Sequence, residues 1–248
     1  MNKIVAGLLV LILGYGDSSA QDTKDPSKFA FDLYAQVVKA NEGGNVFLSP
    51  AEVSQALARK DDQANSNFQS YWNLRVDKKW TIGLPFHFAD GATRNHPLMN
   101  LWGDFRFVET KLWKAVRLPC GKKDETAMYL FVPNEGRTLA DLHASVTTDG
   151  FEQAIRTMKV AHCGIQLPRV SLKCEADLSR PLGVRFAHRT GLELNEENAA
   201  AHGDAPRDIN KQGPNEATMI VADRPFFFVI RDDTTGAILF LGSIVDPR

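Results

Sequence analysis

Apolar residues recur at helical spacing near the start of the chain and then give way to a polar stop. The recurring positions are Phe29, Leu33, Tyr34, Val37 and Val38. This spacing predicts an amphipathic helix that ends in the Gly-rich stretch 42–45. Val46–Leu48 follows as a short apolar strand. Ser49, Pro50 and Glu52 then form an N-cap, a first-turn proline and a capping-box glutamate, which predict a second helix through Leu57.

The middle of the chain carries mostly strand patterns. A charged stretch at 58–63 interrupts the apolar pattern, which resumes over 64–72. Alternating or continuous apolar runs predict strand structure over 106–118, 126–132 and 165–172. Pro168 suggests that the last of these is an edge strand or contains a bulge. One or two helices are expected from the spacing of Leu139, Leu142, Val146, Phe151 and Ile155.

The C-terminal segment has the clearest pattern. Phe226–Ile230 and Ile238–Leu241 are apolar runs joined by a polar Asp-Asp-Thr-Thr-Gly turn at 232–236. This arrangement predicts a buried hairpin. Pro225 fits the first position of its strand, where no ladder donor is needed. The hairpin alone indicates a core element and no function.

Composition narrows the class of protein. The 248 residues include 29 basic and 30 acidic side chains, and 44% of the chain is hydrophobic, which is typical of a globular protein with a sizeable core. Nucleic-acid binding normally needs a basic excess, so we expect no nucleic-acid partner. No Cys or His spacing indicates a metal site, and we expect no cofactor. Enzyme signatures such as a Gly-x-Ser-x-Gly elbow, a His-Glu-x-x-His helix or a phosphate-binding glycine loop do not occur, so an enzyme is not expected.

The first twenty residues have the layout of a secretory signal peptide. Lys3 precedes the apolar run 4–13, and Ser18 and Ala20 occupy the small positions before Gln21. A membrane anchor is the alternative, but the run is shorter than the roughly 20 residues that a span needs. We therefore expect secretion to the extracellular space and no membrane association. Three cysteines are present, Cys120, Cys163 and Cys174. One disulfide with one free thiol is compatible with that compartment, and three buried free thiols are favoured.

Several of these segments, in their order along the chain, resemble the serpins. The resemblance rests on the closing hairpin at 222–247, on the Gly-Asn-Val-Phe-Leu-Ser-Pro sequence at 44–50 and on four segments that match serpin strands in order, 84–88, 97–100, 105–107 and 112–119. It implies an α+β fold with mixed and antiparallel sheets packed with helices, and one shortened domain over 21–248. Asn45, Ser49 and Pro50 would lie in the buried region where the serpin sheet opens. Helices and strands of the full fold are missing near 58–63 and after 177–184.

The resemblance also places the functional segment. Residues 188–197 would run into a reactive-centre loop at 195–217, a long segment of a kind that is usually functional. A plain surface loop is the alternative. In serpins a protease cleaves this loop, and the hinge then inserts as a new strand of a central sheet. The implied hinge consists of Glu196, Glu197, Asn198, Ala199, Ala200 and Ala201.

The implied loop matches the insertion mechanism in its first half and departs from it in its second. Ala199, Ala201, Gly203 and Ala205 share one face at strand spacing and are all small. Arg207 continues that face, and Pro206 lacks the N–H that a central strand donates. The candidate scissile-bond region contains Arg207, Lys211 and Gln212.

The sequence thus supports two functions. The first is a secreted suicide-substrate inhibitor of an extracellular serine protease, with trypsin-like enzymes favoured by the basic residues. The second is a non-inhibitory serpin-like binding or carrier protein, or an inactive truncated product. Heparin-type activation is not expected, because the helix that usually carries the basic site falls in the first gap.

Overall fold

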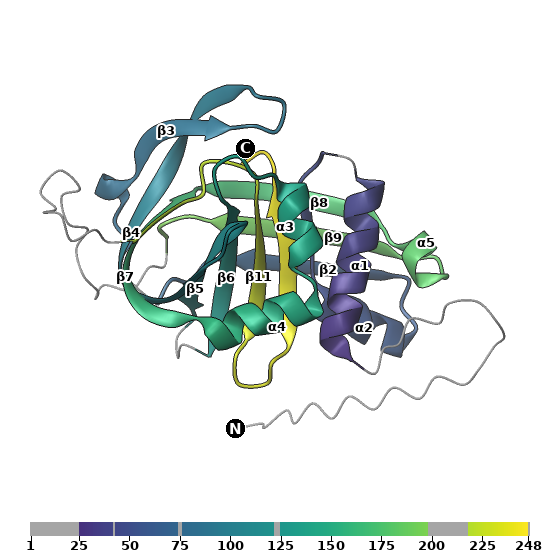
Figure 1. Ribbon diagram of the computed structural model, residues 1–248. Coiled ribbons are helices and arrows are strands. Elements are labelled where there is room, and N and C mark those ends of the chain that lie inside the picture. Colours follow the sequence, from purple (N-terminus) through teal and green to yellow (C-terminus); the bar gives the residue numbers. More distant parts are fainter. Residues whose placement is uncertain (1–24, 42, 74–75, 122–124, 198–217, 248) are drawn as a thin grey trace, which may run out of the picture.

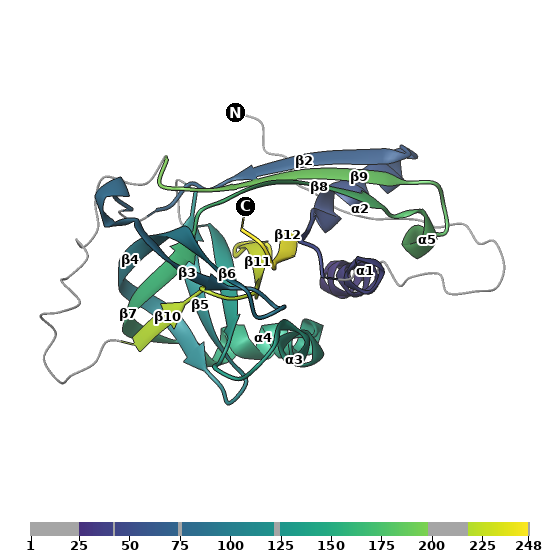
Figure 2. The ribbon, with the colours of Figure 1, turned by 90° about the horizontal axis from the view of Figure 1, so that it is seen from above.

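The chain folds into two β-sheets and a small set of helices (Figure 1). The structure is a computed structural model that describes residues 25–41, 43–73, 76–121, 125–197 and 218–247. Seen from above, the smaller sheet forms a separate layer along one side, and helices α3 and α4 lie on the opposite side of the molecule (Figure 2). This arrangement confirms the expected α+β class.

The larger sheet has nine described strands, and most neighbouring strands within it are antiparallel. Its path is β1 (Val46–Leu48), β12 (Ile238–Ile244), β11 (Phe226–Asp232), β6 (Thr126–Pro133), β5 (Trp113–Cys120), β4 (Thr93–Glu109), β7 (Lys159–Pro168) and β10 (Thr218–Val221), with β3 (Ile82–His87) paired to β4. The pairing of β10 with β7 is parallel. The expected hairpin is confirmed as β11 and β12, with a register shift at Ile230/Arg231.

The smaller sheet has three strands in the order β2 (Gln63–Gln69), β9 (Ala187–Leu194) and β8 (Val170–Asp177). β2 and β9 are parallel, while β8 and β9 are antiparallel. Exposed and buried positions alternate along β2 and β8, so one face of this sheet is solvated and the other packs on the core.

Four of the five described helices begin where a side chain caps them, and the short α5 has no side-chain cap. They are α1 (Pro26–Ala40), α2 (Pro50–Arg59), α3 (Leu139–Ser145), α4 (Thr148–Thr157) and α5 (Ser179–Leu182), with a 3₁₀ turn at Lys78–Trp80. The Ser49 side chain accepts a hydrogen bond from the Glu52 N–H, as expected for an N-cap. A full capping box starts α3 at Thr138 and Asp141. Among the described residues, no helix is long and apolar enough to cross a membrane.

Two apolar clusters hold these layers together. The first contains Phe31, Tyr34 and Phe151 from the helices, and their rings contact Phe227 or one another. The second lies between the two sheets and includes Phe47, which packs on Phe228. Each fully buried side chain of this size contributes about 1.5–3 kcal/mol through loss of apolar surface to water. The two clusters fix the position of the small sheet over the large one.

Two strand boundaries differ from the sequence expectation. The strand pattern expected over 106–118 is divided between two strands, because a turn after Glu109 separates β4 from β5, in agreement with the separate serpin-like segments 105–107 and 112–119. Thr110 causes this turn, since its hydroxyl oxygen accepts hydrogen bonds from the N–H groups of Leu112 and Trp113. The expected strands 97–100 and 105–107 merge into the 17-residue strand β4.

The expected strand 165–172 is also wrong. Pro168 ends β7 opposite Leu98, and Val170 starts β8 in the other sheet. The proline therefore marks a change of sheet, and the strand it terminates has partners on both sides. None of the three cysteines forms a disulfide, as favoured from the sequence, and Cys120 and Cys163 are buried while Cys174 is half-buried.

Candidate functional site

Residue Asn195, the first residue after β9, is held firmly in place. Its carbonyl oxygen accepts hydrogen bonds from the Trp72 indole at 2.8 Å and from the Ser70 hydroxyl at 3.1 Å. Its N–H donates to the same Ser70 oxygen at 3.2 Å. Ser70 and Trp72 are buried and lie just beyond β2. The end of β2 therefore fixes the point where the expected loop begins.

Glu196, a residue of the expected hinge, is buried and has charged and polar partners. Its side chain is 1% exposed, and Arg169 donates to it from Nε at 2.8 Å and from Nη2 at 2.7 Å. The Thr81 hydroxyl also donates to Glu196. Burial by itself raises the pKa of Glu196, but the hydrogen bonds from Arg169 and Thr81 outweigh it and lower the pKa below its usual value. Glu196 is therefore a carboxylate at neutral pH.

Arg169 lies at the change of sheet between β7 and β8. Its N–H donates to the Pro97 carbonyl at 3.0 Å, and its own carbonyl contacts His96 Nε2 at 2.6 Å. The hydrogen bond to Glu196 raises the pKa of the Arg169 guanidinium. Arg169 thus links Glu196, in the expected hinge, to β4 of the larger sheet. Arg169 was not predicted as a functional residue, and its only signal in the sequence was a basic residue directly after Pro168 in an apolar segment.

Glu197 differs from its neighbour because it is exposed. Its side chain is 60% exposed and forms a 3.6 Å ion pair with Lys78, which is 66% exposed. Such surface pairs contribute about 0–1 kcal/mol. The expected hinge therefore begins with a buried residue, Glu196, followed by a solvated one, Glu197.

Most of the expected loop lies outside the described residues. This applies to Asn198, Ala199, Ala200, Ala201, Arg207, Lys211 and Gln212. The chain is described again at Thr218, where β10 starts beside β7. Gly164 of β7 permits close packing there, because a Cβ at this position would clash with the Met219 sulfur and lie 2.8 Å from Trp102. Both ends of the expected loop are thus attached to sheets.

A second polar cluster lies under the pair β2 and β9. His188 Nε2 accepts a hydrogen bond from the Ser49 N–H at 3.0 Å, and Nδ1 lies 3.0 Å from the Ala64 carbonyl, which assigns the proton to Nδ1. Burial lowers the pKa of His188, although the Ala64 contact opposes this. Thr190 donates to the Phe47 carbonyl at 2.7 Å. The cluster joins both strands to the start of α2, and the sequence analysis did not single out His188.

Asn45 and Ser49, which the resemblance places in one buried region, bind different parts of the structure. The Ser49 hydroxyl donates to the Leu239 carbonyl at 2.9 Å, and its N–H donates to His188 of β9. Ser49 therefore connects the small sheet to β12. Asn45 Oδ1 accepts from the N–H groups of Val245 and Asp246, and its amide donates to the Asp246 carbonyl. Asn45 therefore holds the residues after β12.

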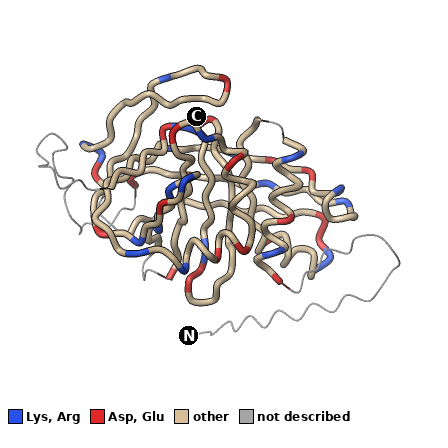
Figure 3. Tube along the Cα trace, in the orientation of Figure 1, with Lys and Arg blue, Asp and Glu red and all other residues tan. Residues whose placement is uncertain are grey.

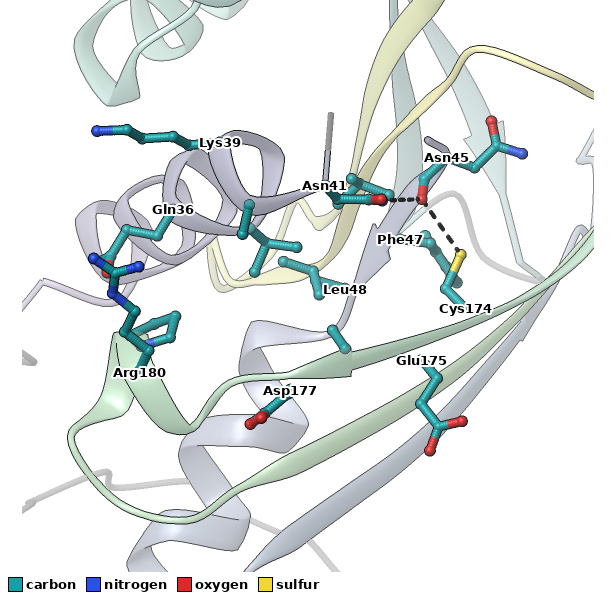
Figure 4. A pocket seen from close by; sticks show the side chains of 15 residues that line it. Gln36, Lys39, Asn41, Asn45, Phe47, Leu48, Cys174, Glu175, Asp177 and Arg180 are labelled. Atoms are coloured by element: carbon teal, nitrogen blue, oxygen red, sulfur yellow. Dashed lines mark hydrogen bonds between the residues drawn. The ribbon is translucent and has the colours of Figure 1, made fainter. Parts of the chain in front are cut away.

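A cavity of about 560 Å³ lies between α1, β1 and β8 (Figure 4). Figure 4 shows Lys39 and Arg180 on one side and Cys174 beside the Asn45 carbonyl. Burial raises the pKa of the Cys174 thiol to about 11, so it is protonated and weakly nucleophilic at neutral pH. Among the described residues, no group of three His, Cys, Asp or Glu side chains could hold a metal ion.

Comparison with known proteins identifies the family. A family model described as serpin (serine protease inhibitor) matches residues 64–184 and 184–247. The chain belongs to the serpin family. Serpin-Z2 of Arabidopsis thaliana is 30% identical over 198 residues, which cover 73% of this chain and 48% of that protein. Serpin-Z2A of Triticum aestivum is 28% identical over 218 residues, covering 73% of this chain and 54% of that protein.

A solved serpin structure shows the same fold. The crystal structure of native protease nexin-1 with heparin matches with a TM-score of 0.74 at 15% identity, covering 90% of this chain and 98% of that chain. The expected serpin-like fold, shortened relative to a full serpin, is confirmed. The chain spans about half the length of the curated serpins it matches. In this shortened serpin, β2 and β9 are direct neighbours.

Proposed function

We propose that this serpin is a secreted inhibitor of extracellular serine proteases that acts as a suicide substrate through segment 195–217. The matching family model is described as serine protease inhibitor, which supports the inhibitor class. In the proposed reaction the protease serine oxygen attacks the carbonyl carbon of a basic loop residue, the bond from that carbon to the nitrogen of the next residue breaks, and the serine proton passes to the new amine. The remaining acyl-enzyme is trapped when the hinge enters the small sheet.

The parallel pairing of β2 with β9 is the observation that best supports this proposal. A chain that turns back after Glu197 runs antiparallel to β9, and therefore also antiparallel to β2. Insertion between them would replace one parallel pair with two antiparallel pairs, which are slightly more stable per residue. The small residues Ala199, Ala201 and Gly203 would suit the buried face of such a strand.

Trypsin-like proteases are the proposed targets. Arg207 and Lys211 supply the basic residue that pairs with a carboxylate in the specificity pocket of these enzymes. Basic and acidic positions are interspersed along the described chain (Figure 3). We therefore propose no polyanion, membrane or heparin-type activator as a partner. Residues 1–20 are proposed to direct secretion.

A non-inhibitory serpin-like binding protein is the second candidate. It is favoured by the small sheet, in which β2 is a terminal strand, and by Pro206 and Arg207 in the second half of the loop. With β2 supported on one side only, insertion would stabilise the product less than in a sheet with further strands. A cleaved loop would then leave the protease active.

Incubation with trypsin, followed by denaturing electrophoresis and mass determination, tests the proposal. The inhibitor function predicts a covalent adduct that survives denaturation. The adduct should be lost in Lys211→Ser if cleavage follows Lys211, or in Arg207→Ser if cleavage follows Arg207. Ala201→Pro removes an N–H donor from the inserting hinge and should convert the chain to a cleaved substrate without adduct. Cleavage of the unmodified chain with full protease activity retained would instead favour the second candidate.

A further inference from the structure

Strand β2 leaves one edge of the small sheet without a partner. The sheet has the order β2, β9, β8, and no strand in the described ranges pairs with the outer side of β2 (Figure 2). The Ser70 N–H donates to the Glu193 carbonyl, and the Asp62 carbonyl accepts from Ala187. Because backbone groups alternate in direction along a strand, the even-numbered residues face β9. The N–H and C=O groups of Gln63, Asn65, Asn67 and Gln69 therefore face outward.

This edge lacks the features that usually prevent edge-to-edge pairing. The strand sequence Gln-Ala-Asn-Ser-Asn-Phe-Gln contains no charged residue, proline or glycine over seven residues. Natural edge strands commonly carry charges, prolines or bulges that discourage pairing with another chain. Gln and Asn side chains on the solvated face can instead hydrogen-bond to amide side chains of a second strand. The edge is thus suited to a polar, uncharged strand.

Ser66, at the centre of β2, has an unsatisfied hydroxyl group. The residue is 8% exposed, and its Oγ is buried without a hydrogen-bond partner among the described residues. Its neighbour across the sheet, Thr190, donates to Phe47 instead. A buried hydroxyl without a partner costs about 1–3 kcal/mol, so a donor or acceptor beyond the edge would stabilise this position.

We propose that the outer edge of β2 pairs antiparallel with β2 of a second copy of this chain, in a register centred on Ser66. This register places Asn65 opposite Asn67 of the second copy and Gln63 opposite its Gln69. These residues face outward, so each opposed pair exchanges two backbone hydrogen bonds. The twofold symmetry doubles the two pairs to four, which gives about eight hydrogen bonds in total. The two sheets become one six-stranded sheet, and the twofold symmetry closes both β2 edges.

The same register satisfies Ser66. Ser66 opposes Ser66 of the second copy in a non-hydrogen-bonded pair, whose Cα atoms lie about 4.5 Å apart with side chains close together. Each hydroxyl then has the other within reach, and cross-strand Ser and Thr hydroxyls are known to pair. Ala64 faces Phe68 of the second copy on the same side, a small residue opposite a large one. A shift by one residue would oppose outward and inward backbone groups, so it cannot form this ladder.

Sedimentation and cross-linking of the purified full-length chain test the pairing. We expect a discrete species of twice the 27.5 kDa chain mass. Ser66→Cys should form an intermolecular disulfide, because the Cα separation of the opposed pair is compatible with disulfide geometry. Asn65→Cys is the matched control, since Asn65 lies diagonally from its own copy, about 7–8 Å away, and should cross-link far more slowly.

Charge variants separate pairing from misfolding. The double variant Asn65→Lys with Asn67→Lys opposes like charges across the twofold axis and should weaken dimerisation by about 100-fold. Asn65→Glu with Asn67→Glu should do the same, and mixing the two variants should restore a one-to-one dimer. A misfolded variant would not be rescued in this way.

Three results would overturn the proposal. A monomer at tens of micromolar in which the two cysteine variants cross-link equally excludes the interface. A monomer whose Asn65 and Asn67 amides resist hydrogen exchange places another segment of the same chain, such as 198–217, on this edge. Open-ended aggregation without a discrete dimer excludes the closed twofold pairing.

Discussion

Arg169 binds the buried carboxylate of Glu196 with two nitrogens, Nε at 2.8 Å from Oε2 and Nη2 at 2.7 Å from Oε1. The pair is asymmetric, because Arg169 is 39% exposed while Glu196 is 1% exposed. The exposed cation keeps part of its hydration, whereas the carboxylate depends on its protein partners. Loss of either residue should therefore have different consequences.

Arg169→Met is predicted to destabilise the chain more than Glu196→Gln. The first variant leaves a buried carboxylate with Thr81 as its remaining side-chain donor, which should cost about 3 kcal/mol. The second leaves Arg169 partly hydrated and should cost about 1 kcal/mol. Urea denaturation at pH 7 measures both. Glu197→Gln is the matched control and should change the free energy of unfolding by less than about 1 kcal/mol. Equal losses for the first two variants would contradict the asymmetry.

The Glu196 contribution to stability is predicted to disappear in acid. Its pKa is lower in the folded state than in the unfolded state, so its stabilising effect is present above the unfolded value near ~4.3 and is lost as the pH falls through the folded value. In Arg169→Met, burial should dominate and raise the pKa of Glu196 in the folded state above its unfolded value. Protonation of Glu196 in acid should then stabilise the folded state instead of destabilising it. Unfolding free energies measured between pH 7 and pH 3 should show a smaller acid loss for this variant than for the unmodified chain.

His188 is predicted to add a second acid-sensitive contribution. Because its folded pKa is lowered, the unfolded state binds the proton more readily, and stability falls as the pH drops below about 6.5. His188→Gln can accept from Ser49 and donate to Ala64 without titrating, so the stability slope between pH 6.5 and pH 5 should become shallower. His143, whose pKa burial lowers to about 4, acts in the same direction and remains in this variant.

His188→Ala should be far more damaging at pH 7 than His188→Gln. Alanine leaves the Ser49 N–H and the Ala64 carbonyl without their side-chain partner, a loss of about 3 kcal/mol. Equal stability of the two variants in thermal denaturation would show that the hydrogen bonds of His188 contribute little.

Gly164→Ala is predicted to loosen β10, the strand that follows the expected loop. The added Cβ would meet the Met219 sulfur and the Trp102 ring, so overpacking should cost about 1–3 kcal/mol. Hydrogen exchange should become faster at Thr218–Val221. Gly83→Ala is the control, because a Cβ there has nothing within 4 Å. Unchanged exchange at β10 in Gly164→Ala would mean that Met219 and Trp102 adjust without loosening the strand.

The sequence predicted elements whose signals are local. The hairpin of β11 and β12 follows from two apolar runs and a polar turn, and α2 follows from the Ser49 cap. The prediction of one strand over 165–172 was wrong because an apolar run has the same pattern within one strand and across a change of sheet. Glu196 was assigned to the hinge from the family resemblance, but its burial depends on Arg169, which is 27 residues away. Such a pairing follows from topology, and residue spacing cannot reveal it.

Thermal denaturation of the intact chain and of the chain cleaved within 198–217 tests most directly whether the hinge can enter between β2 and β9. Trypsin cleavage at Arg207 or Lys211 would provide the cleaved form, with both fragments kept together. Insertion predicts a higher midpoint after cleavage, by roughly 10 °C if the new strand adds several kcal/mol. An unchanged or lower midpoint would contradict insertion and, with it, the suicide-substrate mechanism proposed for this serpin.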